Sequence, residues 1–391
     1  MFLQQLAVDQ WESGGKRESN MDRRKFVSNF SLMSGLASCP WLATNSWGAP
    51  STVPPAAVST RAPTDVLPVV ELVNKKTRSA IDKGLKFLAR KQIRAGRNKG
   101  AFGNSGYPSG VAVTSLAGLA FMCSGSTPVS GPYAKNIADC ADFVVRNSRD
   151  TGYIARTDGS GFSNMYGHGY AMLFLAQVCG MSTNDVVAKK LRNAIKLTCS
   201  IQNDEGGWRY QPRKSSADLS ITICQIMAMR AARDAGLQVP DEVRTKCIEY
   251  VKKSQKSDGS FQYTLRGGRT TVALTAAGVV SLYSAGIYEG ENIEKALKWI
   301  MQRKPSKSGS ASVSPMNYYY AHYYAVQAMW HAQFKHPDYW NEWYQAIRDE
   351  LVDRKRSGSE WPDSRVGAEF GTAMACIILQ MPFNYLPIFS P

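Results

Sequence analysis

The stretch Gln202-Asn-Asp-Glu-Gly-Gly-Trp208 returns one unit later as Gln255-Lys-Ser-Asp-Gly-Ser-Phe261, and both follow the pattern Gln-x-x-x-Gly-x-aromatic. Turn glycines recur at similar spacing along the chain. They are Gly100, Gly152, Gly207, Gly259, Gly309 and Gly358, separated by 52, 55, 52, 50 and 49 residues. Repetition at such a period is typical of repeat architectures. In the motif we expect the glycine to permit a tight helix exit, the glutamine amide to bond a helix end, and the aromatic ring to wedge between units.

Each unit contains two predicted helices of different character. The first has apolar residues three and four positions apart with charges between them, as in 80–91, 242–253 and 291–302, which indicates an outer helix with one wet face. The second is apolar nearly all round and rich in small residues, as in 113–122, 169–178, 272–283 and 371–381, which indicates a helix buried on both sides. Six such pairs predict an all-α fold, an (α/α)6 toroid whose loops at one end form the mouth of a central cavity.

The Gln-to-aromatic motifs resemble the QW repeat of squalene-hopene and oxidosqualene cyclases, whose toroid relatives include the β subunits of protein prenyltransferases. The resemblance covers about residues 75–391 and implies a cavity for an isoprenoid or another hydrophobic ligand. The cyclases carry Asp-x-Asp-Asp-Thr at the start of an inner helix, where the central acid protonates an alkene. The segment 217–222 keeps Asp218 and Thr222 but has Ser220 at the central position. A serine hydroxyl is far too weak an acid for that step, so squalene-type cyclisation by this motif is not implied.

A second part of the resemblance concerns zinc. Prenyltransferase β subunits place a zinc-binding His in a Tyr-rich helix start that is similar to residues 316–330, and His322 falls at that position. The Asp-x-Cys that should accompany it is replaced by Arg269-Thr270-Thr271. Because the ligand set is incomplete, we predict no metal and no other cofactor.

Candidate site residues lie where the inner helices begin at the mouth. Asp218 and His168 are the candidate catalytic residues. The candidate ligand-binding residues are Tyr166, Tyr170, Ser220, Thr222, Arg269, Tyr319, Tyr320, His322 and Tyr323. Structural roles compete with these functions: His168 can be a hydrogen-bonded cap, and Asp218 or Ser220 an N-cap. Arg269 suits a carboxylate, sulfate or phosphate, or lies in a surface loop, and the tyrosines are either core residues or a platform for apolar chains, cations or sugars.

These residues leave three function classes open. The first is an enzyme of the terpene cyclase type that uses another acid, either Asp218, Asp363 or Glu369. The second is an exported, non-catalytic binding or scaffold module. The third is a polysaccharide lyase or hydrolase in which His168 is the base and Arg269 the carboxylate clamp. The fold alone does not choose among them, because one fold hosts many functions.

The first 49 residues are predicted to form a signal region. A start at Met21 followed by Arg23-Arg24 and a modestly apolar segment resembles a twin-arginine export signal. Leu36-Ala-Ser-Cys39 is similar to a lipobox, in which Cys39 is acylated, and cleavage near Ala49 is the alternative. The composition of residues 50–70 predicts a disordered linker, and residues 71–391 are expected to form the toroid. We therefore expect export to the periplasm or anchoring as a lipoprotein.

The charge distribution indicates which partners to expect, and the cysteines indicate the state of the thiols. The chain has 47 Lys and Arg against 31 Asp and Glu, a net charge of +16, but the basic residues are spread over the outer helices and the signal region. We expect no nucleic-acid partner, and we expect a hydrophobic small molecule or membrane lipid, with attraction to a membrane surface as a further possibility. The seven cysteines after Cys39 lie among apolar neighbours and predict buried free thiols rather than disulfides.

The lipobox gives the first testable prediction. Cys39→Ala should remove acylation and release the protein from membranes, since the acyl chain would be attached at that sulfur. Fractionation with palmitate labelling measures both effects. Arg23→Lys with Arg24→Lys is the control for export itself. Unchanged labelling and membrane association of the Cys39→Ala variant would rule out the lipoprotein.

Overall fold

A computed structural model describes residues 66–103, 110–156, 164–305, 313–354 and 358–390. The described residues belong to one compact unit, Arg61–Pro391. The predicted twin-arginine segment, Cys39, most of the predicted linker and the turn glycine Gly309 lie outside the described residues.

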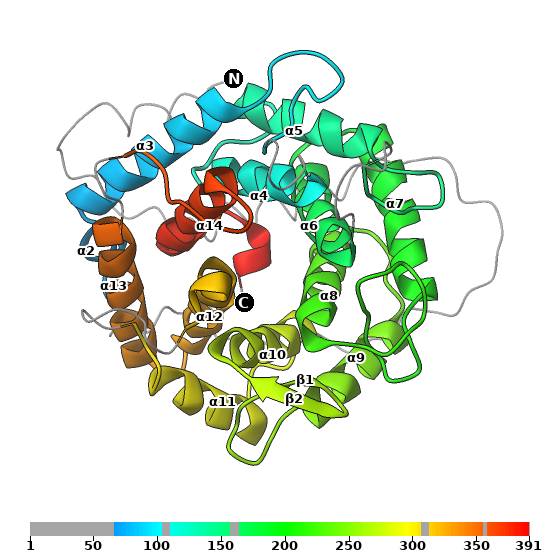
Figure 1. Cartoon of the computed structure of the whole chain (residues 1–391), viewed down its shortest axis with the longest axis vertical. Helices are drawn as coiled ribbons and strands as arrows, with labels where there is room; N and C mark the ends of the chain where they lie inside the picture. The colour runs from blue at the N-terminus through cyan, green and yellow to red at the C-terminus, as the bar shows by residue number, and fades with distance from the viewer. Residues whose placement is uncertain (1–65, 104–109, 157–163, 306–312, 355–357, 391) are drawn as a thin grey trace, which may run out of the picture. The chain divides into compact units, whose positions relative to one another are not determined.

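The described residues form a toroid of alternating outer and inner helices (Figure 1). The outer helices are α3 (Lys75–Lys91), α5 (Ala134–Arg146), α7 (Asp185–Ser200), α9 (Asp241–Lys253), α11 (Glu291–Met301) and α13 (Pro337–Arg354). The inner helices are α4 (Val111–Met122), α6 (Met165–Met181), α8 (Leu219–Asp234), α10 (Val272–Ser284), α12 (Tyr318–Ala332) and α14 (Ala368–Gln380). Each inner helix packs against the next and α14 packs against α4, so the inner ring closes. The predicted all-α (α/α)6 toroid is confirmed.

Burial follows the two predicted helix types. Outer helix α3 buries Ile81, Leu85 and Leu88, spaced four and three residues apart, and keeps most of its charged residues toward solvent. Inner helix α10 is buried at every position from Val272 to Ser284, as a helix between two neighbours and an outer helix must be. None of the described helices is both long and apolar enough to cross a membrane. The cysteines of the described residues are free thiols, and Cys179 and Cys199 are only partly buried.

The turn glycines are needed for backbone reasons at four positions. Gly100, Gly152, Gly206 and Gly259 have φ values between +90° and +96°, which L side chains rarely adopt. Each also touches the backbone of the next outer helix: a Cβ on Gly206 would lie 2.1 Å from the carbonyl oxygen of Lys246 in α9. In the third unit this glycine is Gly206, not Gly207 as the repeat spacing suggested.

The motif glutamine ties each turn to the following unit. Gln202 Nε2 donates to the carbonyl oxygens of Gly206 and Val243, both at 2.9 Å. Gln255 Nε2 donates likewise to Gly259 and to Asn292. The glutamine therefore bonds a helix end, as the sequence predicted, and that end is the first turn of the next outer helix.

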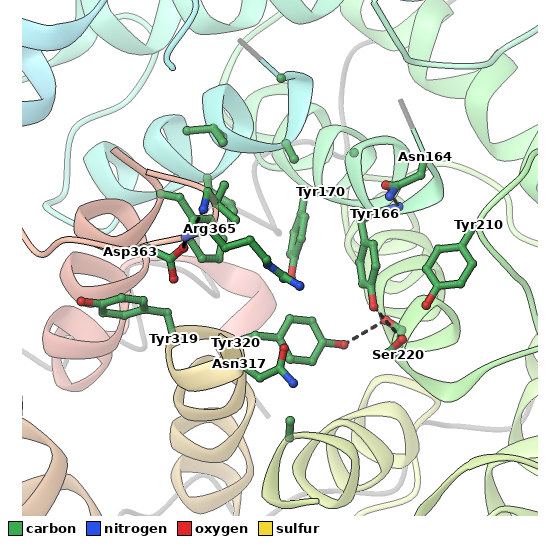
Figure 2. Close-up of a pocket in the computed structure, with 18 of the residues that line it drawn as sticks. Asn164, Tyr166, Tyr170, Tyr210, Ser220, Asn317, Tyr319, Tyr320, Asp363 and Arg365 are labelled. Carbon is green, nitrogen blue, oxygen red and sulfur yellow. Dashed lines mark hydrogen bonds between the residues drawn. The ribbon is translucent and has the colours of Figure 1, made fainter. Parts of the chain in front are cut away.

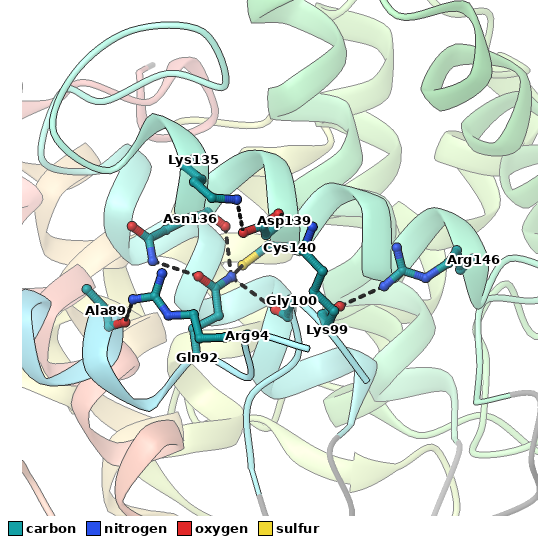
Figure 3. A network of polar contacts seen from close by, with 10 residues as sticks. All are labelled: Ala89, Gln92, Arg94, Lys99, Gly100, Lys135, Asn136, Asp139, Cys140 and Arg146. Atoms are coloured by element: carbon teal, nitrogen blue, oxygen red, sulfur yellow. Dashed lines mark hydrogen bonds and ion pairs between the residues drawn. The ribbon is translucent and has the colours of Figure 1, made fainter. Parts of the chain in front are cut away.

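The first unit contains the same contact, which the sequence pattern did not reveal (Figure 3). Gln92 Nε2 donates to the carbonyl oxygens of Gly100 at 3.1 Å and Asn136 at 2.9 Å, and Asn136 Nδ2 donates back to Gln92 Oε1 at 2.6 Å. Gln92 lies eight residues before Gly100, twice the separation in the motif. Because this loop is longer, the sequence pattern does not reveal the contact, but the structure contains it.

Several shorter elements complete the toroid. The short helix α2 (Val69–Leu72) precedes α3, and Leu67 N donates to Asn341 Oδ1, so the packed fold starts before the predicted boundary at residue 71. Strands β1 (Gln262–Thr264) and β2 (Gly267–Thr270) form an antiparallel hairpin where a loop was expected. The 3₁₀ turns η2 (Pro315–Asn317) and η3 (Met381–Phe383) flank α12 and α14.

The C-terminal segment lies at one end of the inner ring. The turn η4 (Pro387–Phe389) packs on α8, and Figure 1 shows this red segment inside the ring. Arg230 Nη2 donates to the carbonyl oxygen of Ser390, and Trp330 Nε1 donates to that of Phe389, both at 2.7 Å. Both donors lie near the C-terminal ends of inner helices, so this segment occupies the end of the ring opposite the helix starts.

The glycine contact gives a stability prediction. Gly206→Ala should destabilise the protein by about 3 kcal/mol, because alanine adds left-handed strain and a clash with the α9 backbone. Gly236 has φ +83°, and a Cβ added there would have nothing within 4 Å, so Gly236→Ala should cost only the strain, about 1 kcal/mol. Denaturant unfolding measures both. Equal losses for the two variants would contradict a tight contact at Gly206.

Candidate functional site

A cavity of about 470 Å³ opens at the N-terminal end of the inner ring. Each of the six inner helices contributes a first-turn residue to the cavity wall: Val111, Tyr166, Ser220, Ala273, Tyr319 and Phe370. Further aliphatic groups come from Val113, Leu116, Ile154, Leu274 and Val366. The wall thus combines an apolar surface with tyrosine rings, and Figure 2 shows the labelled residues converging on it.

Six of the predicted site residues line the cavity. They are Tyr166, Tyr170, Ser220, Arg269, Tyr319 and Tyr320. Successive helix residues are about 100° apart, so residues two positions further along face the opposite side. This geometry separates Tyr166 from His168 and Ser220 from Thr222. The predicted residues His168, Asp218, Thr222, His322 and Tyr323 are not part of the cavity wall.

His168 faces the outer ring instead of the cavity. Its Nδ1 accepts the Ile154 N–H at 3.1 Å, and its Nε2 pairs with Thr198 Oγ1 of α7 at 2.9 Å. Burial lowers the pKa of His168 to about 3, so the ring is neutral at pH 7. The structure does not bring His168 and Asp218 to one cavity, and it gives His168 a structural contact in place of the predicted catalytic one.

Four other units use a threonine for the same contact. The hydroxyl oxygen of Thr222 accepts the Trp208 N–H at 3.2 Å, and that of Thr275 accepts the Phe261 N–H at 3.2 Å. Thr114 and Thr372 accept the N–H groups of Phe102 and Trp361. Thr222 is therefore a structural anchor for the turn. The Trp208 and Phe261 rings are buried, as predicted.

His322 and Tyr323 are buried beneath the cavity wall. His322 lies against the rings of Tyr318 and Trp343, and burial lowers its pKa to about 3. Tyr323 is one turn deeper than Tyr319 and contacts the ring of Tyr170 edge-on. No group of three His, Cys, Asp or Glu side chains that could hold a metal occurs among the residues the structure describes.

Asp218 is connected to the cavity through hydroxyl groups. Its Oδ1 caps α8 by accepting the Ile221 N–H at 3.0 Å, and it accepts a 2.6 Å bond from Ser220 Oγ. Tyr166, on the cavity wall, donates to Ser220 Oγ at 2.6 Å (Figure 2). Burial raises the pKa of the Asp218 carboxyl, while the bonds from Ser220 and Ile221 oppose the rise. Asp218 is thus both the N-cap of α8 and the inner end of a Tyr–Ser–Asp chain.

Several cavity residues were missed because they lie outside the helix starts. Tyr210 and Tyr263 come from loop and hairpin, join their hydroxyls at 2.5 Å, and have the Arg209 guanidinium over both rings. Arg156 and Arg365 also line the cavity. Of the three alternative acids named from the sequence, Asp363 lies in the wall, whereas Asp218 and Glu369 do not. No repeat pattern marks these positions, so the sequence offered little signal for them.

The closed double ring and the cavity at its helix starts define an α/α toroid protein with a tyrosine-lined pocket. Residues 168–322 match the family model of the prenyltransferase alpha-alpha toroid domain. This match confirms, for those residues, the resemblance that the sequence indicated, and the closed ring of helix pairs confirms the α/α toroid fold.

Solved structures agree on the fold. The type II terpene cyclase from Scytonema in complex with geranylgeranyl dihydroxybenzoate aligns with a TM-score of 0.54 at 15% identity, over 82% of this chain and 100% of that one. Cellobiose 2-epimerase from Bacillus thermoamylovorans B4167 aligns with a TM-score of 0.61 at 10% identity, over 79% and 98% of the two chains. The cellobiose 2-epimerase from Spirochaeta thermophila DSM 6192 gives 0.59 at 13% identity, over 80% and 98%. No curated protein matches the sequence.

His168 yields a prediction about acid sensitivity. Its folded pKa of about 3 lies below the ordinary value of 6.5, so the unfolded chain binds more protons between these pH values and stability falls as pH falls through them. His168→Thr should reduce this fall, because threonine serves the same contact in other units. His168→Ala should lower stability at pH 7 by about 3 kcal/mol, since it leaves the Ile154 N–H unpaired and opens a cavity.

Urea unfolding from pH 4 to pH 7 measures the effect. Val186, an exposed residue without a titratable side chain, provides the control substitution Val186→Thr. An unchanged pH profile for His168→Thr would show that His168 does not contribute to acid lability.

Proposed function

We propose that the toroid binds an extended hydrophobic molecule, an isoprenoid or the chain of a membrane lipid, in the cavity at the start of the inner helices. The observation that carries this proposal is the wall itself, in which aliphatic side chains are interspersed with tyrosine rings. A volume of about 470 Å³ falls in the range of about 300 to 1,000 Å³ typical of small-molecule sites. The terpene cyclase alignment, whose partner holds a geranylgeranyl compound, supports the same ligand class.

Catalysis by alkene protonation is not part of the proposal. The Tyr166–Ser220–Asp218 chain presents two groups to the cavity, the Ser220 hydroxyl, which is a very weak acid, and the Tyr166 phenol. Burial raises the pKa of that phenol well above its ordinary value. Such a phenol is too weak an acid to protonate an alkene. A non-catalytic binding module is therefore compatible with the contacts of this chain of hydroxyl groups.

A sugar is the second candidate ligand. The alignments with cellobiose 2-epimerases, together with tyrosine rings that can stack on sugars, favour testing it. The polysaccharide lyase or hydrolase is the weaker hypothesis, because His168, its proposed base, does not line the cavity.

We also propose, from the twin-arginine and lipobox motifs alone, that the protein is exported and works in the periplasm or at a membrane. In that setting membrane lipids are the accessible source of long apolar chains. The Cys39→Ala substitution tests this second part independently of the cavity.

The ligand test uses delipidated protein and geranylgeraniol. Calorimetry should detect binding, and Ala112→Phe, which places a ring in the cavity wall, should weaken it by about tenfold or more. Tyr320→Phe keeps the ring and loses only the hydroxyl that donates to the Ser220 carbonyl, so it should bind like wild type. Native mass spectrometry of protein from its own membranes shows whether a lipid co-purifies. Binding of cellobiose with no binding of geranylgeraniol would replace the apolar ligand by a sugar.

A further inference from the structure

The electrostatics of the cavity mouth are one-sided. All six inner helices start at the cavity, so the positive ends of their macrodipoles meet there. Three arginines, Arg156, Arg269 and Arg365, line the same wall, against one carboxylate, Asp363. The mouth thus carries a positive potential that an apolar ligand without a charge would leave unused.

The three arginines of the cavity wall differ in the contacts that they make. Arg156 is buried and donates to Asn98 Oδ1, so it has a structural partner. Arg269 and Arg365 are exposed at the mouth, and neither forms an ion pair with another described residue. The Oδ1 atom of Asp363 accepts the backbone N–H groups of Arg365 and Val366 at 3.0 and 2.7 Å, so this carboxylate is used to shape the loop.

The inner helices also differ in whether a side chain caps their N-terminus. Asn164, Asp218 and Thr271 cap α6, α8 and α10 with their side chains. The N-cap residues of α12, α14 and α4, namely Asn317, Gly367 and Gly110, make no such bond. These three helices are consecutive in the ring (Figure 1), and Arg365 lies in the segment that leads into the middle one.

Resting on the proposed hydrophobic ligand, we propose that this ligand carries a carboxylate, held at the mouth by Arg365 and Arg269 beside the uncapped first turns of α12 and α14. Guanidinium groups and first-turn N–H groups are the donors that planar oxyanions prefer. The apolar part of the ligand then extends inward along the tyrosine-lined wall, and the head group stays at the end where solvent enters.

The test compares ligands that share one chain. Geranylgeranoic acid should bind delipidated protein about tenfold more tightly than geranylgeraniol, the gain expected from charge-assisted hydrogen bonds at a partly exposed site. Higher salt should weaken the acid and leave the alcohol unchanged. The double variant Arg269→Gln with Arg365→Gln should bring the acid to the affinity of the alcohol.

The control is Arg213→Gln, which removes one charge from a loop residue outside the cavity wall. The carboxylate site is ruled out if geranylgeraniol binds as tightly as the acid, or if Arg213→Gln weakens binding of the acid as much as the double variant does. Neither result would contradict the proposed hydrophobic ligand. If neither compound binds, the proposed function fails and the inference fails with it. Geranylgeranyl monophosphate forms a third arm: tighter binding than the acid replaces the carboxylate by a phosphate.

Discussion

The contact on which the toroid depends is the one between a turn and the next outer helix. In it a glutamine amide bonds the carbonyl of the turn glycine and a carbonyl in the first turn of the following helix, as Gln202 does with Gly206 and Val243. The glycine lies so close to that helix that no side chain fits. Because the contact joins consecutive units, its repetition sets the angle between them, and a constant angle lets the ring close.

The same turn determines which residues face the cavity. The aromatic residue that follows the glycine donates its backbone N–H to a side chain in the first turn of the inner helix, as Trp208 does to Thr222. This bond fixes the rotation of the inner helix about its axis. With Thr222 turned toward the outer ring, Ser220 is turned toward the cavity. In the second unit His168 takes the place of the threonine and Tyr166 the place of the serine.

This geometry explains which predictions from sequence succeeded. Helical periodicity and the turn glycines were sufficient for six pairs and for the order of outer and inner helices. Helix starts were also the right place to look for the cavity, and Tyr166, Tyr170 and Tyr320 were found there. Rotation about the helix axis cannot be inferred from residue type, however, so His168 and Thr222 were grouped with residues that face the other way.

Loops were the second obstacle. Tyr210, Tyr263 and Arg365 reach the cavity from segments with no periodicity, where spacing carries no information about direction. The longer loop between Gln92 and Gly100 likewise hid a repeat contact that the structure preserves. Prediction from sequence was thus reliable where the backbone repeats and weak where one unit departs from the others.

The two ends of the inner ring differ. Arg230 and Trp330 hold the C-terminal segment at one end of the inner helices, and the cavity lies at the other. A long molecule that enters the cavity by the mouth does so with one end leading. Its apolar end is more stable against Leu116 and the tyrosine rings than in water, whereas a charged end would lose its hydration there. The polarity of the ligand and the polarity of the helix starts consequently favour the same orientation, with charge at the mouth.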